Sequence, residues 1–113
     1  MNKIEAIIRP GKLDTVKAAL ASAGFIGLNV TMTTGRGSQK GIVSQTRGTG
    51  TIEVDMIQKV KIELVVDAKK TKKACDLIVE NAKTGNIGDG KIFVSPISQV
   101  IRVRTGETDA KAL

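Results

Sequence analysis

The alternation of apolar and polar residues along the chain predicts several strands. The alternation is clean over 59–66, returns over 100–104 and is partial over 3–9. Residues 25–34 are rich in β-branched side chains, and 91–94 are mainly apolar, so each is predicted as a further strand.

Apolar residues at three- and four-residue steps predict helices over 13–23 and 69–83. Gly24 follows the first helix in the position that favours a left-handed cap. The apolar stripes contain Leu13, Val16, Leu20 and Ala23 in the first helix and Ala74, Ile78 and Ala82 in the second. The order β-α-β-β-α-β predicts an α+β, ferredoxin-like fold, with one antiparallel sheet and both helices on one face.

The two faces of this sheet carry different side chains. Beneath the helices we expect Ile62, Leu64, Val66, Ile101 and Val103. The opposite face would carry Lys3, Glu5, Ile7, Arg9, Lys61, Glu63 and Val65. Because this second face mixes aliphatic groups with opposite charges, it suits contact with another subunit, with its ions paired. A solvent-exposed face is the alternative.

The pattern breaks down between Gly35 and Met56, where five glycines alternate with serine and threonine. We interpret this stretch as one loop of about twenty residues, and loops of that length are usually functional or disordered. Ordering such a loop costs about 1–2 kcal/mol per residue in backbone entropy. We therefore expect the loop to be mobile in the free protein and to become ordered on a ligand or partner.

Composition limits the classes of function. The 113 residues make one domain, and 41% hydrophobic with 26% charged residues is typical of a globular protein. With no histidine and one cysteine, Cys75, a zinc site or a Cys–His nucleophile is nearly excluded. No apolar run has the length of a membrane span, and the N-terminus lacks a signal-peptide pattern. We expect a cytoplasmic protein without direct membrane insertion.

The net charge of +7 invites a nucleic-acid interpretation. Much of that charge lies in residues 69–73, where a solvated helix face explains it at least as well. The aromatic residues are Phe25 and Phe93 alone, so platforms on which bases could stack are missing. A ferredoxin-like RNA-binding module is still the alternative function, because such modules share this element order.

The segment 84–94, TGNIGDGKIFV, carries the strongest chemical signal. Its glycines permit positive φ and a close approach of backbone N–H groups to an anion, and Lys91 adds a positive charge. It matches part of a Walker A motif, but Ile92 stands where that motif needs Ser or Thr for magnesium. The segment predicts a phosphate-binding loop that is not a P-loop NTPase. An enzyme using Lys91 is disfavoured, because no paired carboxylates, histidine or activated serine support it.

Taken whole, Thr84 to Ile97 resembles the C-terminal signature of the PII signal-transduction proteins. The resemblance covers almost the entire chain. Residues 3–10 are similar to the family's first strand, 35–41 to the base of its T-loop, and 101–107 to its C-terminal nucleotide contacts.

The resemblance implies a single PII-like domain over 1–113, with a T-loop at about 35–56 and a B-loop at about 84–91. Family members are non-enzymatic homotrimers that bind ATP or ADP in clefts between subunits and sense 2-oxoglutarate through Mg²⁺-ATP. They control nitrogen metabolism by binding an ammonium transporter or other membrane transporter, a nitrogen-assimilation enzyme or a regulator through the T-loop. A cytoplasmic regulator that does not bind nucleic acid, recruited to the membrane through a transporter, is therefore implied.

The resemblance also assigns residues to sites. The nucleotide would be bound by Asn29, Gly35, Gly37, Ser38, Thr84, Gly85, Ile87, Gly88, Asp89, Gly90, Lys91, Arg102 and Arg104. 2-Oxoglutarate would be bound by Gln39, Lys40, Gly41 and Lys59, with Gln39 also at the magnesium ion, and Arg47 would contact the partner.

The positive charges of Lys91, Arg102 and Arg104 agree with a nucleotide-binding site. Arg102 and Arg104 are two residues apart in a predicted strand, so both would point at one ligand. We expect them to converge with Lys91 on the phosphates of the nucleotide.

The chain departs from the family at three places. Ser38 stands where an arginine near the distal phosphates is usual, which leaves the preference between ATP and ADP open. Asn29 replaces a common threonine. The chain contains no tyrosine, so uridylylation of a T-loop tyrosine is excluded.

Overall fold

The computed structural model describes residues 1–36, 42–46, 50–54 and 56–113. Its helices are α1 (Leu13–Ser22) and α2 (Thr71–Ala82), each preceded by a short 3-10 turn. Its strands are β1 (Asn2–Ile8), β2 (Asn29–Gly35), β3 (Ile42–Thr46), β4 (Gly50–Val54), β5 (Ile57–Val66) and β6 (Lys91–Pro96).

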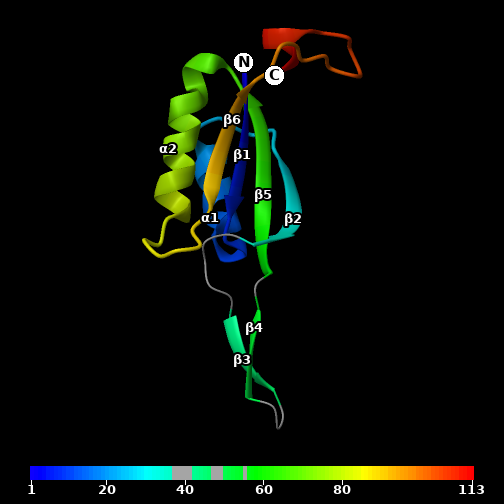
Figure 1. The fold of residues 1–113 in the computed structure, drawn as a ribbon. Helices are drawn as coiled ribbons and strands as arrows, with labels where there is room; N and C mark the ends of the chain where they lie inside the picture. The colour runs from blue at the N-terminus through cyan, green and yellow to red at the C-terminus, as the bar shows by residue number, and fades with distance from the viewer. Residues whose placement is uncertain (37–41, 47–49, 55) are drawn as a thin grey trace.

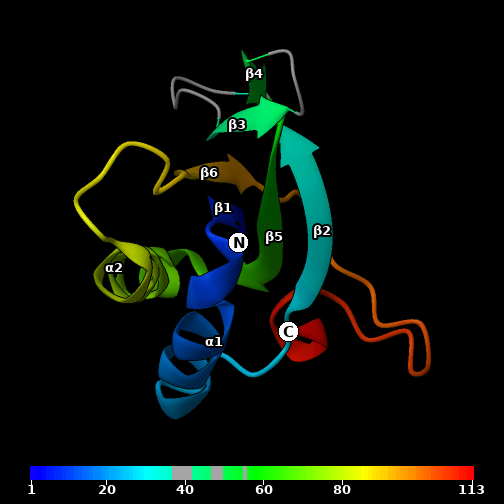
Figure 2. The same cartoon turned by 90° about the horizontal axis from the view of Figure 1, so that it is seen from below.

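Four of the strands form one antiparallel sheet in the order β2-β5-β1-β6. Both helices lie on the same face of this sheet (Figures 1 and 2). In the central pair, Asn2 lies opposite Val66 and Ile8 lies opposite Val60. The predicted α+β, ferredoxin-like arrangement is confirmed.

The core lies between the sheet and the helices, and it is aliphatic except for Phe25. The predicted residues Ile62, Leu64 and Val66 of β5 are at most 5% exposed. The helix stripes are also buried as predicted, at Val16, Leu20, Ala74, Ile78 and Ala82. Gly24 has φ +93° after α1, which confirms the left-handed cap. Phe25 turns into the core instead of starting a strand, so β2 begins four residues later than predicted, at Asn29.

The other face of the sheet carries paired ions, as predicted. The Lys3 ammonium lies 3.0 Å from the Glu5 carboxylate and 3.8 Å from that of Glu63. The Lys61 ammonium lies 2.9 Å from Glu63. The two central strands thus present a row of ion pairs on this face, where an RNA-recognition domain would place aromatic rings.

The predicted strand over 100–104 is wrong. Ile101 makes one isolated bridge to Thr108, and the chain turns between them. Ile101 is 58% exposed and Val103 is 100% exposed, so neither packs beneath the helices. The reason is that the Ile97 N–H donates to the carbonyl of Met1, the first residue of the chain, so pairing with β1 stops there. The residues after Ile97 therefore run beyond the strands with which they could pair.

The prediction of one irregular loop over 35–56 is also wrong in part. Strands β3 and β4 form an antiparallel ribbon, with Ile42 opposite Val54 and Thr46 opposite Gly50. The glycine-rich composition suggested a loop, although residues 42–46 and 51–54 are two short runs rich in β-branched side chains, which favour strands. The expected mobility of the loop stays a prediction.

Candidate functional site

A cavity of about 580 Å³ lies at the end of the sheet where β2 ends and β6 begins. It has the size of a small-molecule site. Three cations from different elements line it: Arg36 after β2, Lys59 in β5 and Lys91 in β6. Ile7 and Phe93, on the open face of the sheet, add apolar surface. The cavity therefore combines positive charge with an apolar wall.

The loop between α2 and β6 forms one side of this cavity. The B-loop, predicted at about 84–91, comprises residues 84–90, because Lys91 is the first residue of β6. Gly85, Gly88 and Gly90 all have positive φ, as the sequence predicted. At Gly90 a side chain is excluded, because a Cβ atom there would lie 1.7 Å from the carbonyl oxygen of Ile7. Glycine at this position lets the loop lie directly against β1.

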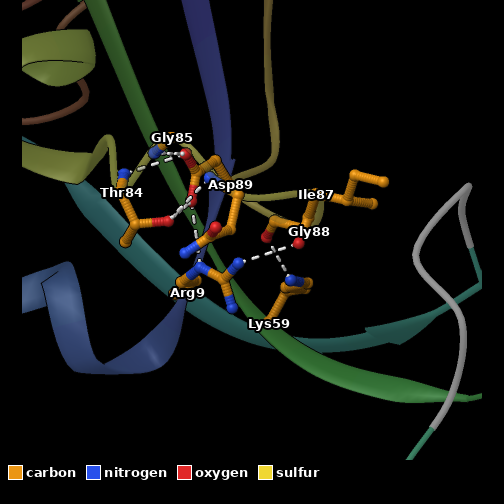
Figure 3. Close-up of polar contacts among 8 residues, drawn as sticks. Arg9, Lys59, Thr84, Gly85, Ile87, Gly88 and Asp89 are labelled. Atoms are coloured by element: carbon orange, nitrogen blue, oxygen red, sulfur yellow. Dashed lines mark hydrogen bonds and ion pairs between the residues drawn. The ribbon is translucent and has the colours of Figure 1, made fainter.

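The Asp89 side chain closes the B-loop from within (Figure 3). Its carboxylate accepts hydrogen bonds from the Thr84 N–H at 2.8 Å, the Thr84 hydroxyl at 2.5 Å and the Gly85 N–H at 2.8 Å. The Arg9 Nε donates to the same carboxylate at 3.0 Å, and another Arg9 nitrogen donates to the Ile87 carbonyl at 2.9 Å. Arg9 thus ties the loop to the end of β1.

These contacts determine the charge of Asp89. The Thr84 hydroxyl, the N–H groups of Thr84 and Gly85, and the Arg9 guanidinium hold the pKa of Asp89 well below its ordinary value, although partial burial opposes them. The carboxylate is therefore ionised at neutral pH.

Lys59 of β5 also contacts the B-loop. Its ammonium donates to the Gly88 carbonyl at 2.5 Å (Figure 3). Burial, and secondly the nearby charge of Arg9, lower the pKa of Lys59. The N–H groups of Ile87 and Gly88 make no hydrogen bond to any part of the chain that the structure describes. Such N–H groups suit an anionic ligand.

One chain brings together only some of the predicted site residues. Gly35, Lys59, Lys91 and residues 86–90 of the B-loop line the cavity, whereas Thr84 and Gly85 do not. Asn29 lies at the other end of β2, in a second hollow with Lys3 and Glu63.

The C-terminal segment that contains Arg102 and Arg104 runs beyond that same far end of the sheet (Figure 1). Arg102 donates to the Leu113 carbonyl at 3.4 Å and lies 4.0 Å from Glu107. Arg104 lies in the turn that follows. The expectation that both arginines share a strand face is therefore wrong. Their convergence with Lys91 on one nucleotide stays a prediction, and it would require a second copy of the chain.

Several predicted residues lie outside the described part of the chain. They are Gly37, Ser38, Gln39, Lys40, Gly41 and Arg47. Sequence reasoning also missed Arg36 and Phe93, which line the cavity. It likewise missed Arg9, which does not line the cavity but bonds to Asp89 of the B-loop. No motif marks Arg9, because its partner Asp89 is 80 residues away. Arg36 could have been noticed as a cation beside Gly35.

Comparison with known proteins identifies the family. The sequence profile described as Nitrogen regulatory protein P-II matches residues 1–107. The chain belongs to the PII family. Proteins named Nitrogen regulatory protein P-II from Nostoc punctiforme and Synechocystis are each 50% identical to it, over 100% of both chains. A protein named Nitrogen regulatory protein P-II 2, from Methanothermobacter thermautotrophicus, is 48% identical, over 100% of this chain and 97% of its own.

The family confirms a regulatory protein of nitrogen metabolism, in agreement with the expectation that the chain is not an enzyme. Within the described ranges, no helix is long and apolar enough to cross a membrane. The same ranges contain no group of three or more Asp, Glu, Cys or His side chains that could hold a metal ion.

Proposed function

We propose that this PII-family protein senses ATP or ADP and transmits the signal through its T-loop. One observation carries the proposal: a glycine loop with N–H groups unused within the described chain and three cations line one cavity. Polyphosphates need this combination of positive charge and backbone donors. Ile7 and Phe93 give the cavity an apolar wall against which part of a nucleotide can pack.

A homotrimer would complete the nucleotide site. Lys91 lies at one end of the sheet, whereas Asn29 and the C-terminal segment that contains Arg102 and Arg104 lie at the other. Residues so separated can serve one ligand only if the two ends come from neighbouring subunits. Ile7 and Val65 are only half-buried on the open face, which favours its contact with another copy of the chain.

2-Oxoglutarate and magnesium would extend this site towards the T-loop. Lys59 would pair with a carboxylate of 2-oxoglutarate, because it is a cation at the rim where β5 begins. Gln39, Lys40 and Gly41 would complete that site, and Gln39 with the phosphates would hold magnesium. A dicarboxylate at Lys59 would compete with the Gly88 carbonyl for the ammonium group. Ligand binding would thereby influence the B-loop and the T-loop together.

The output would be a protein contact made by the T-loop. We expect an ammonium transporter or other membrane transporter, an enzyme or a regulator of nitrogen assimilation as the partner, with Arg47 in the contact. The protein would act in the cytoplasm, and at the membrane when its partner is a transporter.

Calorimetry with Lys91→Ala tests the nucleotide assignment. Loss of a charge-assisted contact should cost about 1.5–3 kcal/mol, or roughly ten- to hundredfold in ATP affinity. Lys73→Ala is the matched control, since Lys73 is an exposed lysine at the start of α2. Equal ATP affinity in the wild type and Lys91→Ala would contradict the assignment.

A further inference from the structure

Asp89 poses an electrostatic problem for a phosphate-binding loop. It belongs to the lining of the cavity, and its side chain is 24% exposed. A carboxylate near bound phosphate repels it, and the repulsion grows as water is excluded. A loop that binds phosphate therefore needs this charge compensated and directed away from the ligand.

Arg9 is the charged group that meets this need. Two of the partners of Asp89, Thr84 and Gly85, are uncharged and belong to the B-loop itself. Arg9 comes from the end of β1, and its Nε lies 3.0 Å from the carboxylate. Its side chain is only 28% exposed, so this ion pair is less screened than one in open water.

Arg9 also orients one peptide group of the loop. It donates to the Ile87 carbonyl at 2.9 Å. Because a trans peptide is planar, the N–H of Gly88 points in the opposite direction to that carbonyl, away from Arg9. The Gly88 N–H finds no partner in the part of the chain that the structure describes. The Arg9 guanidinium therefore compensates the charge of the Asp89 carboxylate and also orients the Gly88 N–H as a hydrogen-bond donor.

We propose that Arg9 is a positioning residue that sets the anion affinity of the B-loop, by compensating Asp89 and by directing the Gly88 N–H away from β1. The ligand class is a nucleotide phosphate, so this inference rests on the proposed function. Arg9 itself touches the loop and acts on the ligand through it.

The test measures ATP affinity by calorimetry in substituted proteins. Arg9→Gln should weaken binding about tenfold, because Asp89 then repels the phosphates. Arg9→Lys keeps the charge but cannot make both contacts, so about a threefold loss is expected. Lys73→Gln removes the same charge from an exposed position on α2 and should leave affinity unchanged within about twofold.

The decisive variant adds Asp89→Asn to Arg9→Gln. Asparagine keeps an oxygen that can accept from the loop N–H groups but carries no charge. The double variant should therefore recover affinity to within about threefold of wild type. If Arg9 served only to hold the fold, the double variant would bind as weakly as Arg9→Gln or more weakly, and that result overturns the proposal.

The remaining outcomes are equally clear. Wild-type ATP affinity in Arg9→Gln would overturn the inference while leaving the nucleotide function intact, provided that Lys91→Ala still loses binding. Absence of ATP binding by the wild type would overturn both. If Arg9→Gln does not fold, Arg9→Lys decides: the threefold loss supports the proposal, and an unchanged affinity overturns it.

Discussion

The B-loop and the C-terminal segment 100–113 are built differently, although each contains a left-handed glycine and an ion pair. The B-loop is tied to distant parts of the chain, through Arg9 at 3.0 Å and Lys59 at 2.5 Å. In the C-terminal segment, the contacts among described residues are local, such as the bond from the Arg102 N–H to the Glu107 carbonyl at 2.8 Å.

This difference shows which part of the site one chain can complete by itself. The sheet and helix layer determine the shape of the B-loop before any ligand arrives. The C-terminal segment leaves Val103 100% exposed, and it lies at the opposite end of the sheet from the B-loop (Figure 1). A segment with such exposed apolar and cationic side chains suits contact with a neighbouring copy.

The largest expected effect is the loss of stability when one glycine in each region is replaced by alanine. Gly90→Ala should destabilise the fold by about 3–5 kcal/mol, because its Cβ would strike the Ile7 carbonyl at a strained backbone conformation. Gly106→Ala is the control, because Gly106 also has positive φ but open space around it. It should cost only about 1 kcal/mol. Denaturant unfolding measures both, and equal losses would show that the B-loop is not closely packed on β1.

A second prediction tests whether the two regions of different subunits form one site. Lys91→Ala and Arg104→Ala should each weaken ATP binding about tenfold or more. When the two variants are refolded together in equal amounts, about a quarter of the clefts in random trimers would pair an intact Lys91 with an intact Arg104.

Calorimetry should therefore recover a fraction of high-affinity sites that neither variant shows alone. No recovery would contradict a site shared between subunits. Light scattering of the wild type gives an independent check, since a monomer at micromolar concentration would contradict the trimer.

The smallest effect concerns the ion pairs of the two regions. The pKa of Asp89 is lowered, chiefly by the Thr84 hydroxyl, so between the folded and unfolded pKa values the unfolded chain binds more protons. Its contribution to stability is present above about pH 4, the ordinary range of an aspartate, and is lost as the pH falls further.

The stability difference between wild type and Asp89→Asn should therefore shrink below about pH 4. Glu107→Gln is the matched substitution in the C-terminal segment. Because Glu107 lies 4.0 Å from Arg102 and is 42% exposed, this change should alter stability at pH 7 by less than about 0.5 kcal/mol. Denaturant unfolding at several pH values measures both variants, and a constant effect of Asp89→Asn down to pH 2 would contradict the prediction.

Periodicity predicted much of the fold. The alternation over 59–66 and the stripe of Ala74, Ile78 and Ala82 correspond to β5 and α2, since both patterns reflect burial of one face. The same alternation failed over 100–104, because a strand also needs a partner, and the Ile97 N–H already bonds to Met1, the first residue of the chain before β1. Glycine-rich composition likewise hid β3 and β4, which pair with each other.

The sequence by itself determined the local features of the site: a glycine loop able to adopt positive φ, a lysine directly after it and the membership of a family. These depend on residues close together in the chain. Only the tertiary structure decided that Arg9 meets Asp89, that Arg36 and Phe93 join the cavity, and that the C-terminal segment lies at the opposite end of the sheet from the B-loop. The physical reason is that such contacts depend on strand order and register, which bring residues 80 positions apart within 3.0 Å and separate others at opposite ends of one sheet.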